Sequence, residues 1–175
     1  MTRIQLPEIN NFNAEQKEKY NRFPSNLIKA MATLAPVQTT AYLDLGVSFR
    51  KGLLSSKDRE FVIVRVGYLS DSEYEIMQHM EIAKSTGLTD DDIIAIEKGD
   101  QSHFDSHLST LMRFVDETVF RIQATDETFK DMQQEFSDPQ IAEVLLLIGH
   151  YMMTARFLRG LDIDLDSNST SWDNM

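Results

Sequence analysis

The chain has 175 residues, of which 42% are hydrophobic, so it is long enough for one domain whose core needs no metal or disulfide. It contains no cysteine, which excludes a disulfide framework, thiolate metal sites and any thiol nucleophile or redox dithiol. Its formal net charge of -11 repels nucleic-acid phosphates and anionic lipids, so we expect neither nucleic acid nor membrane as a partner.

The N-terminal part of the chain predicts three short helices. Residues 13–23 (NAEQKEKYNRF) and 24–35 (PSNLIKAMATLA) have helical composition, and a third helix begins at Pro36 and continues to about Phe49. Proline suits the first helical position because an N–H at that position has no partner within the helix. The opening MTRIQLPEINNF lacks the apolar segment of a signal peptide, so we expect a cytoplasmic protein.

Residues 61–69 (FVIVRVGYL) have the composition of a β-strand, but we interpret them as a buried helix. Ser55 or Ser56 can cap a helix that continues through SKDRE into this segment. No partner strand is evident elsewhere in the chain, which also favours the helix.

The next two helices are indicated by their ends. Ser70 or Asp71 opens a helix over residues 72–86, and Gly87 suits the position directly after its C-terminus. Thr89 is followed by three aspartates, which places a hydroxyl cap and then carboxylates at the positive end of a helix dipole. We therefore predict a further helix after Thr89.

The C-terminal half predicts three more helices. In HLSTLMRFVDETVFRI the apolar residues recur every three or four positions, which indicates an amphipathic helix. Thr125 or Asp126 starts the following helix, and Asp138 starts a long one that ends near Gly160. This last segment is the most apolar of the chain, but its charge-free runs are too short to span a bilayer.

These segments predict an all-α fold with a single domain of about eight or nine helices. The domain covers residues 1–165, and no internal repeat or linker divides it. Residues 166–175 form an acidic, polar tail. We expect the chain from about residue 161 onward to be loosely held, because it offers little apolar surface to bury.

Two polar residues of the helix over 72–86 are the first site candidates. Glu75 and His79 are four residues apart, so their side chains project from the same face, beside the apolar stripe of the helix. This placement suits an acid–base pair in the wall of a pocket, where burial can tune both pKa values. It also suits a boundary pair that is half exposed to solvent, so spacing alone leaves both interpretations open.

Glu60 is the third candidate because it stands directly before the apolar run 61–69. A carboxylate at this position is expected to be partly buried and to need a partner. A nearby arginine or an exposed first helical turn would account for it equally well.

Metal binding has weaker support in the sequence. His103 and His107 stand four apart and could share a metal, but no third ligand is evident. The alternating aspartates of the tail lack the glycine and the final glutamate of a calcium loop. His150 lies in an apolar helix and is expected to be a hydrogen-bonded core residue or to lie at a subunit interface. We therefore expect no metal and no cofactor.

The succession KDREFVIVRVGYLSDSEYEIMQHMEIAKSTGLTDDDIIAIEKG resembles the carboxymuconolactone decarboxylase family, which includes the AhpD-like alkylhydroperoxidases. The similar features are RE before an apolar helix, EYE followed by a histidine, Ala and Gly at intervals of four, and an acidic-capped helix. RIQLPEI, FVDETVFRIQATDETF, QIAEVLLLIGHYMMTARFL and GLDIDL are also similar, so the resemblance extends from about residue 3 to about residue 165. It implies an AhpD-like helical bundle that assembles as a homo-oligomer, a trimer or a hexamer.

The peroxidases of this family carry a glutamate, a Cys-x-x-Cys pair, and a histidine four residues after the second cysteine. Laid on this chain, these positions are Glu60, Ser72, Glu75 and His79. Because both thiols are missing, the dithiol reduction of peroxides is excluded.

The decarboxylase branch has no redox cysteines and places acid–base residues around a small pocket. By this resemblance, Glu60, Glu75 and His79 are the catalytic residues of a cofactor-free lyase or isomerase that acts on a small lactone or aromatic-derived compound. His79 donates or shuttles the proton, Glu75 sets its tautomer and pKa or binds the substrate, and Glu60 completes the relay. The alternative is a family member that binds a small molecule or a partner without turnover.

The charge of the substrate is a separate question. A pocket of two glutamates and one histidine matches a carboxylate substrate poorly unless a cation joins it. Of the cations in the block that carries the resemblance, we expect that only Arg59, Arg65 or Lys84 could supply it. A neutral, apolar or phenolic compound fits these residues as well.

Overall fold

The computed structural model describes residues 2–169, and this part of the chain is built from helices and loops without a β-strand. The predicted all-α fold is therefore confirmed. In chain order the α-helices are α1 (Ala14–Arg22), α2 (Asn26–Met31), α3 (Pro36–Ser48), α4 (Ser56–Leu69), α5 (Glu73–Ser85), α6 (Asp90–Lys98), α7 (Ser106–Arg121), α8 (Asp126–Glu135) and α9 (Asp138–Leu161). Single 3-10 turns occur at η1 (Ile9–Asn11), η2 (Phe49–Lys51) and η3 (Gln101–His103).

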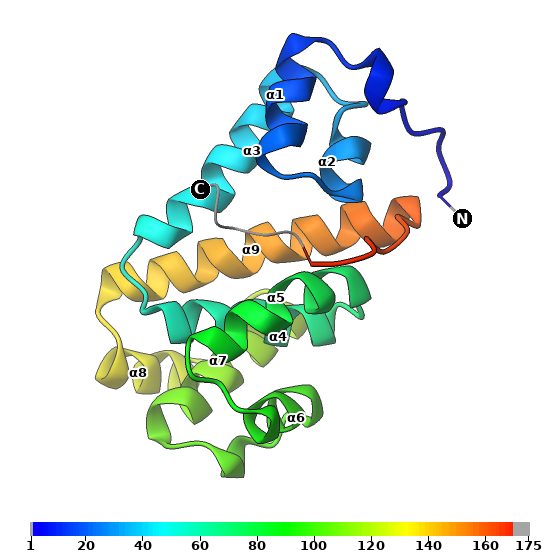
Figure 1. The fold of residues 1–175 in the computed structure, drawn as a ribbon. Helices are drawn as coiled ribbons and strands as arrows, with labels where there is room; N and C mark the ends of the chain where they lie inside the picture. Colours follow the sequence, from blue (N-terminus) through cyan, green and yellow to red (C-terminus); the bar gives the residue numbers. More distant parts are fainter. Residues whose placement is uncertain (1, 170–175) are drawn as a thin grey trace.

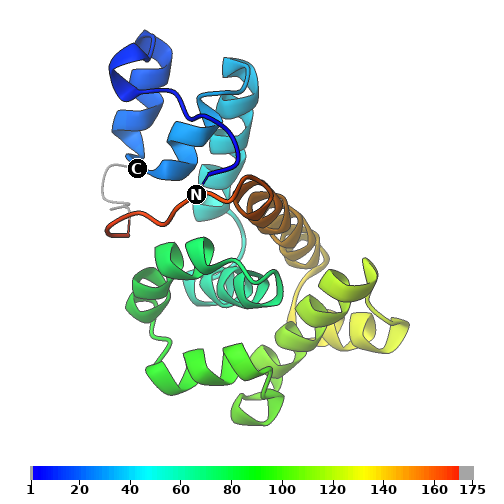
Figure 2. The same ribbon diagram turned by 90° about the vertical axis from the view of Figure 1, so that its right-hand side faces the viewer.

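The long helix α9 crosses the middle of the molecule and separates two groups of helices (Figure 1). Helices α1, α2 and α3 lie on one side of it, and α4, α5 and α7 lie on the other, with α6 and α8 at the far end. Figure 2 shows the same division from the side, with the N-terminal helices set apart from the α4–α8 group.

Helix α4 is the centre of the larger group. It packs against α5, α6, α7 and α9, and every residue from Asp58 to Gly67 is buried. The Ser55 side chain accepts a hydrogen bond from the Asp58 N–H and thereby caps the helix. The prediction that residues 61–69 form a buried helix is confirmed. Because neighbours surround α4, its sequence is apolar on nearly all sides and reads like a strand.

Helix α5 begins slightly later than the sequence predicts. Its first residue is Glu73 and its N-cap is Ser72, not Ser70 or Asp71, because the chain first makes a tight turn in which Asp71 has a φ of 53°. The turn lets α5 pack along α4. This packing brings α5 side chains next to Glu60.

The apolar composition of α9 follows from its place in the core. Contrary to our expectation, the helix is long and apolar enough to pass as a membrane span by length and composition. A core helix meets the same test, and α9 packs against α4, α5, α7 and α8. Its buried residues include Ile141, Val144, Leu147 and Ile148.

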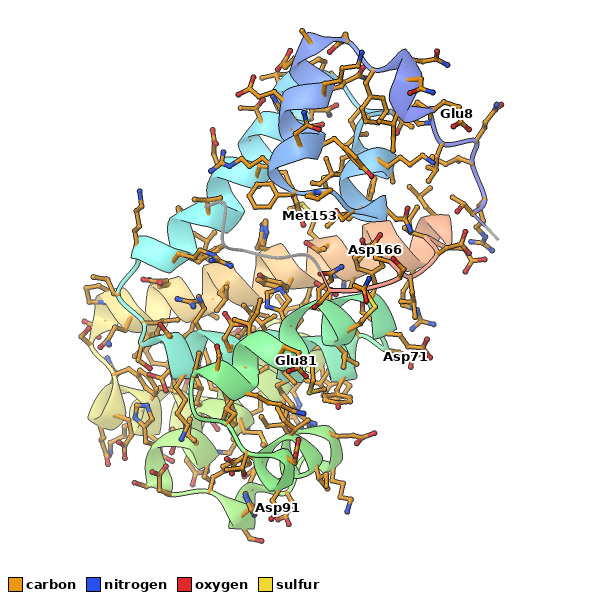
Figure 3. All side chains as sticks on the ribbon, viewed as in Figure 1. Glu8, Asp71, Glu81, Asp91, Met153 and Asp166 are labelled. Atoms are coloured by element: carbon orange, nitrogen blue, oxygen red, sulfur yellow. The ribbon has the colours of Figure 1, made fainter. Side chains whose placement is uncertain are left out.

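The chain after α9 turns back and passes between the N-terminal helices and α5, as Figures 1 and 2 both show. The expectation that this segment is loosely held is wrong for its described part. One carboxylate oxygen of Asp166 accepts a hydrogen bond from the Asn26 N–H at 2.7 Å, and the other accepts from Gln78 Nε2 at 2.9 Å and from the Tyr74 hydroxyl. Figure 3 labels Asp166 at this crossing. Residues 170–175 of the predicted tail lie outside the described residues.

Candidate active site

Side chains from α2, α3, α4, α5 and α9 enclose a cavity of about 90 Å³ between the N-terminal helices and the core. All three predicted site residues, Glu60, Glu75 and His79, line it, and none is more than 5% exposed. Most of the remaining wall is aliphatic or aromatic, including Phe49 and Tyr74. The structure thus brings the three candidates to one apolar cavity.

Glu60 and His79 form a buried pair between α4 and α5. Glu60 Oε2 lies 2.8 Å from His79 Nδ1, and Glu60 Oε1 accepts a hydrogen bond from Arg59 Nε at 3.1 Å. Burial alone would raise the pKa of Glu60, but His79 and then Arg59 outweigh it, so the pKa lies below its ordinary value. Glu60 is therefore a carboxylate at neutral pH, with both oxygens partnered.

The ionised Glu60 also determines the tautomer of His79. A carboxylate can only accept, so His79 Nδ1 carries a proton, and in the neutral imidazole Nε2 then keeps its lone pair. Nε2 lies 3.2 Å from the hydroxyl of Tyr151 on α9. Burial, and then the charge of Glu60, raises the pKa of Tyr151 far above its usual range, so this hydroxyl keeps its proton and donates it to Nε2. Glu60, His79 and Tyr151 thus form one hydrogen-bonded chain across three helices, which we call the relay.

Glu75 lies in the same cavity but outside the relay. Neither of its carboxylate oxygens has a hydrogen-bond partner within residues 2–169. Burial raises the pKa of Glu75 to about 8, and the nearby Ser72 hydroxyl offsets only part of that rise. Glu75 therefore carries a proton at neutral pH. The prediction that Glu75 sets the tautomer of His79 is wrong, because Glu60 and Tyr151 hold the two ring nitrogens.

His150 is a cavity residue that sequence reasoning missed. It is 5% exposed, lines the cavity and stacks on Tyr42 with the ring centroids 4.7 Å apart. Burial, and then the charge of His79, lowers the pKa of His150 to about 4, so its imidazole is neutral at physiological pH. The expectation of a hydrogen-bonded core histidine is wrong for Nδ1, which has no partner in the described part of the chain. A Cβ at position 46 would lie only 3.2 Å from His150 Nε2, so Gly46 makes room for this ring.

Two arginines reach the cavity wall, Arg59 of α4 and Arg50 of η2. The other cations considered from the sequence do not line it. Arg65 is bound to the Asp116 carboxylate through two hydrogen bonds of 2.7 and 2.9 Å, and Lys84 pairs with an aspartate at the surface. The cavity therefore contains cationic groups, and one of them, Arg59, already neutralises Glu60.

His103 and His107 do not converge on one site. His103 Nε2 lies 2.8 Å from Asp92, whereas His107 Nε2 lies 3.0 Å from Asp58. Among residues 2–169, no group of three or more His, Asp or Glu side chains is arranged to hold a metal ion.

The residues missed from the sequence share one signal. His150, Thr154 and Leu158 follow at intervals of four on α9 and all line the cavity, with Tyr151 beside them. His150 and Thr154 are polar residues one turn apart on an otherwise apolar helix, and this pattern is visible in the sequence and could have indicated a cavity. Tyr42 gives no such signal, because it joins this wall through tertiary contacts from α3, which include a hydrogen bond of 2.8 Å to Thr154.

The match to a protein family covers the part of the chain that contains the three predicted site residues. Residues 37–114 match the model of the carboxymuconolactone decarboxylase family. The match includes Glu60, Glu75 and His79 but not the α9 residues His150 and Tyr151. No curated protein is significantly similar to the chain in sequence.

Solved structures share the fold across most of the chain. The AhpD core of a peroxidase-related protein from Ralstonia eutropha JMP134 is similar with a TM-score of 0.81 and 11% identity, over 95% of this chain and 93% of that one. A protein of unknown function from Agrobacterium tumefaciens, linked to the antioxidant defence protein AhpD, has a TM-score of 0.71 and 17% identity, over 78% and 96%. A variant of the debrominase Bmp8, solved with 2,3,4-tribromopyrrole, has a TM-score of 0.72 and 11% identity, over 95% and 91%. At these identities the likeness establishes the fold.

Proposed function

We propose that this chain, whose residues 37–114 match the carboxymuconolactone decarboxylase family, is a cofactor-free lyase or isomerase that transfers protons on a small lactone or aromatic-derived compound. One observation carries the proposal: the relay of Glu60, His79 and Tyr151 lines a partly open, mainly apolar cavity. A histidine that is held at both nitrogens and shielded from water is suited to general acid–base chemistry.

The chemistry follows from the protonation states. When a substrate displaces the Tyr151 hydroxyl from His79 Nε2, that nitrogen takes a proton from a substrate carbon, the C–H electron pair forms a double bond, and the carbonyl electrons move to oxygen. The imidazolium that forms lies 2.8 Å from the Glu60 carboxylate, which stabilises it. Return of the proton to another carbon gives an isomer. In the lyase direction His79 starts as the imidazolium: loss of CO₂ leaves the electron pair as the enolate, His79 Nε2–H protonates the enolate carbon, and water returns a proton to Nε2.

Peroxide reduction by a dithiol is not part of this proposal. The sequence contains no cysteine, and Ser72 and Glu75 stand at the two thiol positions of the peroxidase branch. Neither a hydroxyl nor a carboxylate supplies electrons to a peroxide. A small ring compound is compatible with the fold, since the debrominase of similar structure was solved with a brominated pyrrole.

We further propose that the chain works in the cytoplasm as a homo-oligomer, a trimer or a hexamer. The support is an apolar stripe on the exposed side of α9 that includes Leu145, Leu146 and Met153. Contiguous exposed apolar side chains on a core helix are typical of subunit interfaces. Sedimentation at the mass of one 20.1 kDa chain would contradict the assembly.

Proton exchange in D₂O tests the proposed reaction directly. A panel of lactones and keto–enol compounds is incubated with the wild-type protein and with the Glu60→Gln and His79→Gln variants, and deuterium incorporation is followed by NMR. We expect exchange with at least one compound, and about a hundredfold or greater loss in both variants. His103→Gln at the surface is the matched histidine control and should exchange normally. If the wild type exchanges nothing while compounds bind the cavity, the protein is a binder without turnover.

A further inference from the structure

Two buried polar groups in the cavity are left unused by the relay. Glu75 lies one helical turn before His79 on α5, and His150 directly precedes Tyr151 on α9. Both line the same cavity and neither is more than 5% exposed. The two groups therefore stand beside the relay on the two helices that supply His79 and Tyr151.

Both groups lack partners in the folded chain. Within residues 2–169, neither carboxylate oxygen of Glu75 has a hydrogen-bond partner. His150 Nδ1 has none either. Most buried polar atoms in proteins are hydrogen-bonded, and leaving one unpaired destabilises the fold. A ligand that enters the cavity could supply the missing partner of both groups.

The character of the cavity limits which ligand oxygen fits. Arg59 is already hydrogen-bonded to Glu60, so it is less suited to a free substrate carboxylate. Glu75 is held in its neutral form by burial, and a neutral carboxyl group can donate a hydrogen bond. His150 is neutral as well, and its imidazole has one N–H to donate. Two neutral donors are suited to a carbonyl oxygen.

We propose that the Glu75 carboxyl group and the His150 imidazole together bind the oxygen of an uncharged, enolisable ring carbonyl and stabilise the enolate oxygen formed from it. This inference rests on the proposed function for the enolate, but not for the binding of the carbonyl. A carboxyl group kept neutral by an apolar site is a known means of donating a hydrogen bond to an enolate oxygen.

The step is balanced within the residues named. The substrate C–H bond breaks and its proton goes to His79 Nε2. The C–H electron pair becomes the new C=C bond, and the carbonyl π electrons move to the oxygen. The Glu75 O–H and the His150 N–H donate to that oxygen without giving up their protons. The aromatic rings of Tyr42 and Phe49, both in the cavity wall, suit a flat ring.

Binding of two probes of similar size tests the inference. The dissociation constants of cyclohex-2-en-1-one, an uncharged ring ketone, and benzoate, a carboxylate, are measured by NMR titration. We expect the ketone to bind more tightly than benzoate, and Glu75→Leu and His150→Leu to weaken ketone binding at least about tenfold each. Glu75→Gln, whose amide still donates, should bind the ketone within about threefold of the wild type. Glu81→Gln on the exposed side of α5 is the matched control.

Three outcomes would overturn the inference. They are tighter binding of benzoate, failure of the wild type to bind the ketone, and ketone binding that is unchanged in both leucine variants. The last outcome would mean that water satisfies the two groups. Glu75→Met removes the donor and keeps the length of the side chain, so it takes the place of Glu75→Leu if the leucine variant does not fold.

The same experiment separates this inference from the proposed function. His79→Gln should abolish exchange but leave ketone binding within about threefold, because the relay is not needed to hold the oxygen. If the wild type catalyses no exchange while ketone binding depends on Glu75 and His150, the proposed function fails and the carbonyl site stands. If exchange depends on His79 while ketone binding ignores Glu75 and His150, the carbonyl site fails alone.

Discussion

The relay and the pair of Glu75 and His150 share one cavity, but they differ in whether other side chains of the protein hydrogen-bond to them. In the relay, Glu60 and His79 are bonded to each other and to Arg59 and Tyr151. In the pair, three side-chain atoms are buried without partners in the described chain. The folded chain therefore fixes the geometry of the relay before any ligand arrives, whereas it leaves the pair to be satisfied by something that binds.

This difference has consequences for stability as well as for chemistry. Removing one member of a buried hydrogen-bonded ion pair strands its partner and destabilises a protein by roughly 3–5 kcal/mol. Removing a buried polar group that has no partner should instead relieve a cost of about 1–3 kcal/mol. The two sets can thus be told apart by unfolding experiments without knowing the substrate.

The largest expected effect is on the relay. Glu60→Ala leaves His79 Nδ1 and Arg59 without their shared carboxylate, so the free energy of unfolding should fall by roughly 3–5 kcal/mol. Urea unfolding monitored by circular dichroism measures it. Glu81→Ala on the exposed side of α5 is the control and should change stability by less than about 0.5 kcal/mol. A loss no greater than that of Glu75→Ala would contradict the distinction between the two sets.

The second effect is a pH dependence due to Glu75. Its pKa rises from 4.5 to about 8 in the folded state, so between these values the folded chain binds more protons than the unfolded chain. The contribution of Glu75 to stability therefore falls as pH rises through this window, by on the order of 3 kcal/mol, and levels off above it. Urea unfolding at pH 5.5, 7 and 8.5 should show the fall for the wild type relative to Glu75→Gln. Parallel curves for the two proteins would disprove it.

A smaller effect concerns the outer end of the relay. Tyr151→Phe removes the hydroxyl 3.2 Å from His79 Nε2 but leaves the Glu60–His79 pair intact. We expect stability to fall by about 1 kcal/mol and proton exchange to fall by about tenfold, because the lost bond is between neutral groups. Exchange as low as in His79→Gln would show that the hydroxyl itself carries the proton.

The smallest effect concerns the segment after α9. Asp166→Ala removes hydrogen bonds to Asn26, Tyr74 and Gln78, two of which line the cavity. Because these contacts are partly exposed to solvent, we expect a loss of about 1 kcal/mol, together with faster amide exchange at Asn26 and Leu27. Unchanged exchange rates at these amides would mean that Asp166 does not hold α2.

The sequence predicted the parts of this structure that depend on neighbours along the chain. The Ser55 cap was enough to distinguish helix α4 from a strand, and the spacing from Glu60 to His79, read with the family resemblance, indicated residues that line one cavity. Tyr42 could not be predicted, since it reaches the cavity from α3 through tertiary packing. His150 and Tyr151 stand out as polar residues of the apolar helix α9, but nothing along the chain shows which cavity they face. The role of Glu75 was ambiguous for the same reason, because the tertiary fold decides whether a side chain distant in sequence lies within hydrogen-bonding distance of its carboxylate.

The path of the chain also has a consequence for biosynthesis. Tyr151 comes from the last helix, and Asp166, which ties α2 to α5 at the cavity, follows that helix. A nascent chain that has left the ribosome only as far as α8 already contains Glu60, Glu75 and His79 but has neither the cavity nor the relay. Truncated translation products of this protein should therefore be catalytically inactive. Their acid–base residues would be exposed to water but would not react with cellular metabolites.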